Sequence, residues 1–315
     1  MRNISTLSPT EIKILRQLRE GGESLSSIKD KLGLSAQQIA RTLSSLREKE
    51  FIVVERKGIA KTIWISNMRP AQLLRIILIQ YDHMRLETIL SLSSLEILMS
   101  MSFSSGMTRE EIASSSQKSP RTVATVLRRL GELGMLITDR PGVYRISPRF
   151  IPFAEFAMEF QRQSNQRAVT SLYPDGVIRW QKNGIVLIES KNPDERGGFR
   201  STSFSVFHKY ATTMILTRHW YMNLPDNRKP RLEEVIVHTM LLKPFDARES
   251  RLFLELLRKT ANEIDMKNLT RLAAEYGTSQ NLSEITHDLA RWRKAPHSAV
   301  SLRDSRKVKV TGGKA

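Results

Sequence analysis

The spacing of apolar residues in the first half of the chain repeats itself. Glu11-Ile12 is matched by Glu96-Ile97, and Ile28 is matched by Ile112 after one deleted residue. Five further positions correspond, namely Ile39, Ala40, Leu43, Leu46 and Gly58 in the first copy with Val123, Ala124, Leu127, Leu130 and Gly142 in the second. Apolar residues three and four positions apart form the buried stripe of a helix. The pattern predicts two copies of one unit, each with a first helix, a short second helix (25–32 or 109–115) and a third helix.

Capping residues mark the start of each third helix. Ser35 stands three residues before Gln38, which is the spacing of a capping box. Ser119 is followed by Pro120, an N-cap residue before the proline that is typical of a first helical position. Between the copies, residues 70–90 form one predicted helix with a large apolar share, which suits a joining or dimerisation role.

Each third helix leads into two short predicted strands around a turn, at Lys57-Gly58 in the first copy and at Pro141-Gly142 in the second. Three helices followed by a β-hairpin resemble the winged helix-turn-helix domain, over residues 5–67 and 90–149. The resemblance implies that the third helix enters the major groove of DNA and that the hairpin touches the backbone. A module for protein binding or dimerisation is the alternative for such a fold.

The outward positions of the third helices hold the candidate DNA contacts. Gln and Arg side chains read base edges, and Ser, Thr and Arg side chains hold phosphates. The predicted DNA-binding residues are Gln37, Gln38, Arg41 and Ser45 in the first copy and Arg121, Thr122, Thr125 and Arg128 in the second.

The charge of the chain favours a polyanionic partner. The formal net charge is +18, and such an excess of Lys and Arg commonly serves to bind nucleic acid. An anionic membrane surface is the rival partner, but it calls for one basic amphipathic helix, whereas here the cations are scattered from Arg2 to Lys314. The sequence thus favours DNA over a membrane.

The composition also restricts the chemistry and the location. The chain has no cysteine, which excludes disulfides, thiolate nucleophiles and cysteine-ligated zinc. No apolar run approaches the roughly 18 residues that span a bilayer, and the first residues lack the apolar core of a signal peptide. We therefore expect a cytoplasmic protein.

A second motif lies in residues 172–192. Residues 185–191 form a predicted central strand in which Glu189 and Lys191 share one face. Pro174-Asp175-Gly176 begins the preceding strand, and Asn183-Gly184 is the predicted hairpin turn between the two. Pairing across that turn is expected to bring Asp175 beside Glu189. The structural alternative is an aspartate that caps a turn and a Glu–Lys pair at a strand end.

Pro-Asp followed by Glu-x-Lys after an apolar strand resembles the PD-(D/E)XK nuclease superfamily. The resemblance covers about residues 150–245 and assigns these elements to its core: a helix over 151–166, a strand near 168–172, the hairpin, a helix over 203–221 and a strand over 234–242.

The resemblance implies a metal-dependent endonuclease site. Asp175 and Glu189 correspond to its two metal carboxylates, Lys191 to its lysine, and Glu159, with Glu155 next, to the acid that the first helix often adds. Two carboxylates suit one or two Mg²⁺ (or Mn²⁺) ions, which lower the pKa of the attacking water and neutralise charge that develops on phosphorus. The lysine stabilises that charge.

A second resemblance favours regulation. A winged helix, Pro-Asp-Gly, a strand that ends in Glu, and a Lys-Tyr helix such as "FHKYATTM" (207–214) are similar to plasmid replication-relaxation proteins. These look like nuclease folds used for DNA control. That family tends to show Glu-x-Asp, so Lys191 departs from its pattern and favours an active site.

The predicted fold class is α+β and multidomain, with two winged helix-turn-helix domains before an α/β restriction-endonuclease-like core and a helical C-terminal extension. The domains are 1–68 and 91–149 (winged helices), 69–90 (linker helix), 150–245 (nuclease-like), 246–294 (helices near 247–262, 264–276 and 282–294) and 295–315 (basic tail).

Three functions fit this organisation. The first is a metal-dependent DNA endonuclease, for which cutting both strands suggests a homodimer. The second is a non-catalytic DNA-binding regulator of transcription or of plasmid or mobile-element replication. The third is an adaptor with protein partners in a mobile-element or replication complex.

Overall fold

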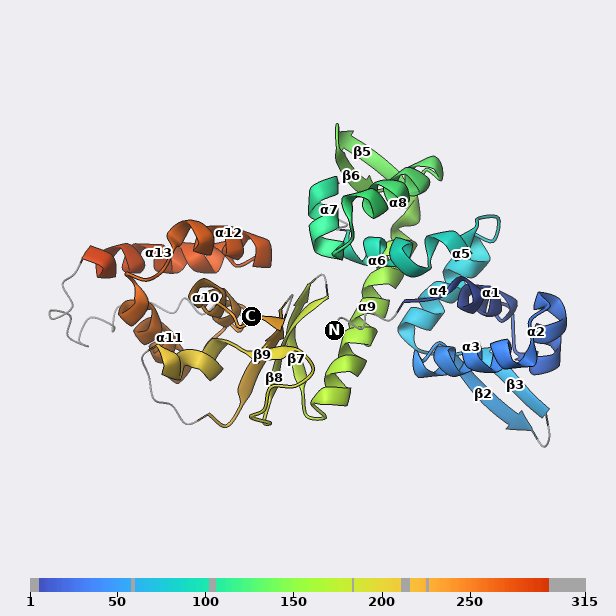
Figure 1. The fold of residues 1–315 in the computed structure, drawn as a ribbon, viewed down its shortest axis with the longest axis horizontal. Helices are drawn as coiled ribbons and strands as arrows, with labels where there is room; N and C mark the ends of the chain where they lie inside the picture. The colour runs from blue at the N-terminus through green and yellow to red at the C-terminus, as the bar shows by residue number, and fades with distance from the viewer. Residues whose placement is uncertain are drawn as a thin grey trace, which may run out of the picture. The chain divides into compact units, whose positions relative to one another are not determined.

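The computed structural model describes residues 6–57, 60–101, 106–182, 184–210, 216–224 and 227–294 (Figure 1). The turn residues Gly58 and Asn183, the whole "ATTM" segment (211–214) and the basic tail from 295 lie outside the described residues. The chain forms two compact units, Met1–Pro174 (unit 1) and Asp175–Ala315 (unit 2). Both combine helices with small antiparallel sheets, which confirms a mixed α+β protein. In the part of the chain that is described, no helix has the length and apolar character to cross a membrane.

Unit 1 contains the predicted duplication. Repeat 1 (9–65) consists of α1 (Pro9–Gln17), β1 (Glu23–Ser24), α2 (Leu25–Leu32), α3 (Ala36–Glu48), β2 (Ile52–Lys57) and β3 (Ala60–Ile65). Repeat 2 (92–146) consists of α6 (Leu92–Ser100), β4 (Met107–Thr108), α7 (Arg109–Ser116), α8 (Pro120–Glu132), β5 (Leu136–Arg140) and β6 (Val143–Ile146). The strand orders β1-β3-β2 and β4-β6-β5 correspond. The predicted order of helices and hairpin is confirmed, and each repeat adds a short strand before its second helix.

The predicted caps position both third helices. The Ser35 hydroxyl accepts from the backbone N–H of Gln38, and the Gln38 side chain accepts from the backbone N–H of Ser35, so the capping box is complete. The Ser119 hydroxyl accepts from the N–H of Thr122, with Pro120 at the first helical position. These bonds satisfy N–H groups that have no partner inside the helix.

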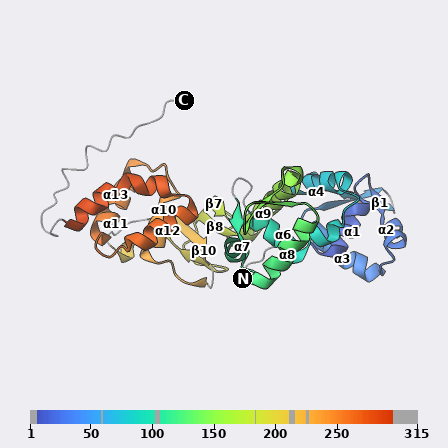
Figure 2. The ribbon, with the colours of Figure 1, turned by 90° about the horizontal axis from the view of Figure 1, so that it is seen from above.

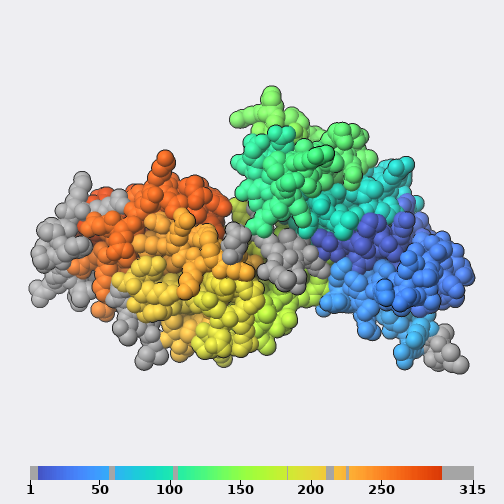
Figure 3. All heavy atoms as spheres, viewed as in Figure 1, coloured from blue at the N-terminus to red at the C-terminus, as the bar shows by residue number. Residues whose placement is uncertain are grey.

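The two repeats share one core with the helices that follow them. Residues 69–90, predicted as one helix, form α4 (Arg69–Gln80) and the short α5 (Leu86–Ile89). After the 3₁₀ turn η1 (Pro148–Phe150), helix α9 (Ile151–Leu172) runs beside α4 and α6 (Figures 1 and 2). A single cluster of buried apolar side chains joins the repeats, α4 and α9. Figure 3 shows the blue atoms of repeat 1 and the green atoms of repeat 2 joined by the cyan segment between them.

Aromatic side chains fix α9 in unit 1. Phe153, Phe156 and Phe160 are fully buried, and the ring centroids of Phe51 and Phe160 are 5.1 Å apart. The division between units therefore falls after Pro174, whereas the nuclease-like domain was predicted to begin at residue 150. The strand expected near 168–172 is wrong, because α9 continues to Leu172.

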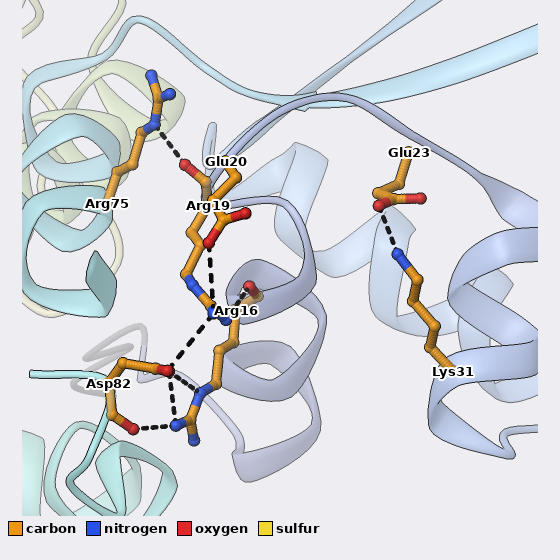
Figure 4. A network of polar contacts seen from close by, with 7 residues as sticks. All are labelled: Arg16, Arg19, Glu20, Glu23, Lys31, Arg75 and Asp82. Atoms are coloured by element: carbon orange, nitrogen blue, oxygen red, sulfur yellow. Dashed lines mark hydrogen bonds and ion pairs between the residues drawn. The ribbon is translucent and has the colours of Figure 1, made fainter.

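A network of polar contacts ties α1 to the segment after α4 (Figure 4). The Arg16 guanidinium donates to the Asp82 carboxylate at 2.8 Å and pairs with Glu87 at 3.3 Å. Arg75 on α4 donates to the carbonyl oxygen of Arg19 at 2.7 Å. The connecting segment is therefore held to repeat 1 by its polar groups as well as by the core.

A buried carboxylate joins α1 to the end of α3. Glu11 is almost fully buried, and one of its oxygens accepts from the Ser45 hydroxyl at 2.8 Å and from Lys49 Nζ at 2.7 Å. Its other oxygen accepts from the backbone N–H of Ser8 at 2.6 Å. The matching Glu96 of repeat 2 pairs with Lys118.

We expect Glu11→Gln to lower the free energy of unfolding by about 2 kcal/mol, because it leaves the ammonium of Lys49 without its counter-charge in a half-buried position. Urea titration followed by circular dichroism measures the loss. Glu20→Gln, an exposed substitution on the same segment, is the control and should change little. Equal stability of the two variants would contradict the role of Glu11.

Unit 2 is built around an antiparallel sheet of order β7-β8-β10-β9. Its elements are β7 (Val177–Lys182), β8 (Ile185–Ser190), β9 (Phe199–Ser201), the 3₁₀ helix η2 (Ser203–Lys209), β10 (His219–Asn223), α10 (Leu232–Met240), α11 (Ala247–Thr260), α12 (Met266–Tyr276) and α13 (Ser279–Lys294). One apolar cluster joins β8, η2, β10 and the four helices. The predicted hairpin and the three C-terminal helices are confirmed.

Two predicted elements of unit 2 are wrong. The expected helix over 203–221 is η2 followed, after a segment that includes the undescribed residues 211–215, by strand β10. The expected strand over 234–242 is helix α10. Every side chain from Glu233 to Met240 is buried, so the run has no polar face and its periodicity does not distinguish a strand from a helix.

His238 on α10 is a buried titratable group. Thr202 Oγ1 lies 2.7 Å from its Nδ1, and its Nε2 is one of two buried side-chain polar atoms in the described residues that have no hydrogen-bond partner. Burial lowers the pKa of His238 from 6.5 to about 3, against the opposing effect of Glu234. The imidazole is neutral at physiological pH.

We expect acid to destabilise unit 2 through His238. Unfolded histidine binds a proton below about pH 6.5 but folded His238 does not until about pH 3, so stability present above 6.5 falls as the pH drops through this window. From about pH 7 to pH 5 the loss is about 2 kcal/mol. Urea titrations in a Trp64→Phe background, in which all tryptophan fluorescence comes from unit 2, measure this loss. The His238→Gln substitution should flatten this part of the profile. An unchanged slope in that variant would contradict the assignment.

Candidate nucleic-acid interface and carboxylate site

The third helix of repeat 1 presents a polar outer face. Gln37 and Arg41 are exposed, as predicted. Gln38 is exposed as well, but its side-chain oxygen is used in the capping box at 3.0 Å from the Ser35 nitrogen. Ser45, also predicted to point outward, donates its hydroxyl to buried Glu11. The structure thus brings Gln37 and Arg41 to the outer face and turns Ser45 inward.

A basic groove lies between α3 and the hairpin of repeat 1. Its volume is about 490 Å³, and its lining is Leu25, Leu43, Arg47, Val54, Arg56, Lys61 and Ile63. Arg56 and Lys61 are directly opposite each other on β2 and β3. Like charges in that arrangement are destabilising, so an anion in the groove would relieve their repulsion. Neither cation of the hairpin was predicted as a DNA contact, because the predicted contacts all lay on the third helices, although the register across a short turn places Arg56 and Lys61 opposite each other.

The third helix of repeat 2 carries its cations at the predicted positions. Arg121, Thr125 and Arg128 are exposed, and Thr122 is half-buried with its hydroxyl 2.9 Å from the capping Ser119 hydroxyl. The Thr125 hydroxyl donates to the carbonyl oxygen of Arg121 at 3.0 Å. Arg121 and Arg128 are therefore the side chains of this face best suited to a phosphate or a guanine edge.

The hairpin of repeat 2 differs in charge from that of repeat 1. Arg145 donates two hydrogen bonds to the Asp139 carboxylate, at 2.9 and 3.0 Å. This contact with Arg145 holds the pKa of Asp139 below its usual range. The pair neutralises charge where repeat 1 leaves two cations opposite each other, so the two repeats are not electrostatically equivalent.

Asp175 was expected beside Glu189, but it lies next to Ser190 and Lys191 at the end of β8, and its contacts are those of a cap. One carboxylate oxygen accepts from the Ser190 hydroxyl at 2.8 Å, and the other accepts from the backbone N–H of Lys191 at 2.6 Å. The bond from the Lys191 N–H, followed by that from Ser190, lowers the pKa of Asp175. Val177 is the residue opposite Glu189, which places Asp175 beyond Glu189 toward the end of the strand.

Glu189 is held by two arginines. Its carboxylate is only 4% exposed; Oε2 accepts from Arg179 Nε at 2.7 Å, and Oε1 accepts from a terminal nitrogen of Arg218. Contact with Glu189 raises the pKa of Arg218. Lys191, at the exposed strand end, has its backbone N–H bound to Asp175. Neither arginine was predicted from the sequence as part of this site.

The carboxylates of Asp175 and Glu189 are not arranged as ligands of a hard divalent cation. All four carboxylate oxygens of Asp175 and Glu189 already accept hydrogen bonds, and two guanidinium charges lie against Glu189. Glu159 belongs to unit 1, where its carboxylate lies 3.8 Å from both Arg69 and Arg162. No group of three or more His, Asp or Glu side chains in the described ranges is arranged to hold a metal.

Comparison of the chain with protein-family models finds no match, and comparison with curated proteins finds none either.

Proposed function

We propose that the chain is a non-catalytic DNA-binding regulator, of transcription or of plasmid or mobile-element replication, that contacts duplex DNA through two winged helix-turn-helix domains, repeat 1 and repeat 2. The observation that carries this proposal is the duplicated unit of three helices and a hairpin, in which each capped third helix presents exposed Arg side chains. A helix of this size fits the major groove, and the hairpin beside it reaches the backbone.

Electrostatics supports the same proposal. The chain carries a formal charge of +18. The groove of repeat 1 brings Arg47 of the third helix together with Arg56 and Lys61 of the hairpin. A phosphate placed there gains contacts with cations that otherwise repel one another. The backbone contacts would fix the position of the protein, and the third helices would supply base contacts.

Binding of the purified full-length protein to a long mixed-sequence duplex tests the proposal. Fluorescence anisotropy over a salt series should give a Kd that rises by orders of magnitude between about 50 and 200 mM salt, since each phosphate contact releases counterions. A protein of the same size and an acidic charge serves as the control. Absence of binding at the lowest salt would overturn the proposed function.

A metal-dependent endonuclease is the second candidate. The observation in its favour is that Asp175 and Glu189, with Lys191 after them, come to one end of the central strand β8. Incubation with supercoiled plasmid and Mg²⁺ or Mn²⁺ separates the candidates. The regulator leaves the plasmid intact. Nicking by the wild type that is lost in Asp175→Ala and in Glu189→Ala would establish the nuclease instead.

A further inference from the structure

Glu189 and its two arginines form a site of their own in unit 2. Strand β8 lies between β7 and β10 in the sheet. Arg179 approaches the carboxylate from β7, and Arg218, one residue before β10, approaches from the other side. A single buried carboxylate therefore holds two guanidinium groups, one from β7 and one from the residue that precedes β10.

An irregularity in β7 directs Arg179 to this site. The register between β7 and β8 shifts between Ile178 and Trp180, so Arg179 is the extra residue of a β-bulge. Bulges re-aim a side chain out of the regular alternation and are frequent beside functional sites. Here the re-aimed side chain reaches Glu189 at 2.7 Å.

The two arginines are exposed to solvent whereas Glu189 is buried, so an external anion can reach the guanidinium groups but not the carboxylate. The Glu189 side chain is 4% exposed, whereas those of Arg179 and Arg218 are 49% and 56% exposed. A guanidinium has five N–H donors, and the contacts to Glu189 use one nitrogen of each arginine. The remaining donors belong to half-exposed groups whose positions the carboxylate fixes.

We propose that Arg179 and Arg218 form a phosphodiester-binding site in unit 2, with exposed Lys191 as an additional cation and Glu189 as the positioning residue. The identification of the ligand as duplex DNA rests on the proposed function. Two fixed guanidinium forks match the tetrahedral oxygens of a phosphate better than flexible side chains do. With Asp175 included, the site has three cations and two carboxylates (3 − 2 = +1), so geometry rather than net charge is its distinguishing property.

The full-length double variant Arg179→Ala/Arg218→Ala tests the site. We expect its Kd for the duplex to rise about tenfold and the slope of log K against log salt to become shallower by about 0.9, the value for one lost phosphate contact. Arg251→Ala/Lys267→Ala, which removes the same charge from exposed positions on α11 and α12, is the matched control. It should stay within about twofold of wild type. Equal effects of the two variants, or no effect of the first, would overturn the inference.

Removal of both arginines leaves Glu189 buried without a counter-charge, which can destabilise unit 2. The triple variant Arg179→Gln/Arg218→Gln/Glu189→Gln avoids this, because all three side chains become neutral together. It changes the net charge by only one, yet we expect it to bind DNA as weakly as the double variant. Wild-type affinity of the folded triple variant would contradict the site.

Glu189→Gln alone tests positioning. Removing a negative charge by itself would strengthen DNA binding, whereas loosening the two arginines weakens it. We expect weaker binding by a few-fold, with thermal unfolding followed in parallel. Tighter binding would overturn the positioning role.

The outcomes also separate this inference from the proposed function. Wild-type protein that binds no duplex contradicts the proposed function itself. Wild-type binding that is weakened by Arg41→Ala/Arg121→Ala in the third helices, but not by the variants of Arg179 and Arg218, contradicts only the site in unit 2.

Discussion

A chain that ends at residue 149 is expected to lose the cooperative unfolding transition of unit 1, whereas a chain that ends at Pro174 keeps it. The shorter chain lacks α9, which buries Phe153, Phe156 and Phe160 in the core shared by both repeats. Burial of each such side chain stabilises a fold by about 1.5–3 kcal/mol. The sum is comparable with the roughly 5–15 kcal/mol that separates folded from unfolded domains.

Thermal unfolding of the two truncated chains, followed by circular dichroism, measures this difference. Phe156→Ala in the full-length protein provides the same test without truncation, at an expected cost of about 3–5 kcal/mol. Met158→Ala is the matched control, since Met158 is exposed on the same helix. A cooperative transition of undiminished stability in the chain that ends at 149 would show that the repeats do not need α9.

Replacing Arg41, Arg121 and Arg128 together by Ala is expected to weaken duplex binding by at least about 100-fold. Each is exposed on a third helix, and an arginine that contacts a guanine or a phosphate contributes about 1–3 kcal/mol. Three losses at the lower end of that range already amount to about 3 kcal/mol. Anisotropy titrations at low and moderate salt measure the loss.

The control for this variant is Arg85→Ala/Arg109→Ala/Arg162→Ala, which removes three exposed arginines of unit 1 outside the third helices. It lowers the net charge equally, so we expect only the general electrostatic effect, a few-fold loss. If both triple variants lose the same affinity, net charge alone accounts for binding and the third helices are not the DNA contacts.

The fold of the repeats was predictable because its signals are local. Ser35 and Ser119 cap the third helices within three residues of their own positions, and the apolar stripes of the helices need no knowledge of distant partners. The third strand of each sheet escaped prediction, since two residues such as Glu23 and Ser24 are too few to show an alternating pattern.

The core of unit 2 was predicted less well, because an element that is buried on all sides lacks the alternation of apolar and polar residues that distinguishes a helix from a strand. Helix α10 is buried on every side, so its sequence has no polar stripe. The extent of α9 could not be predicted either, since its aromatic residues pack on Phe51, which is distant in sequence. The placement of residues 151–172 in unit 1 is thus a tertiary property.

In the candidate site, too, the features set by nearby residues were predictable and those set by distant residues were not. That Asp175 lies near the C-terminal end of β8 followed from the hairpin, which joins segments close in sequence, although the register pairs Glu189 with Val177 and not with Asp175. The partners of Glu189 did not, because Arg179 depends on a bulge and Arg218 depends on β10 lying next to β8. Neither the bulge nor the strand order leaves a recognisable mark in the sequence.

The position of α9 at the end of unit 1 has a consequence for synthesis of the protein. Both repeats leave the ribosome before the helix that completes their core. At about 5–20 residues per second, the 22 residues of α9 take about 1–4 s to be added. During that interval Phe51 and the apolar face of α4 have no aromatic partner from α9. The nascent chain therefore passes through a stage in which the sequences of both repeats are complete but their shared apolar core is not, and this is the stage at which a chaperone would bind it.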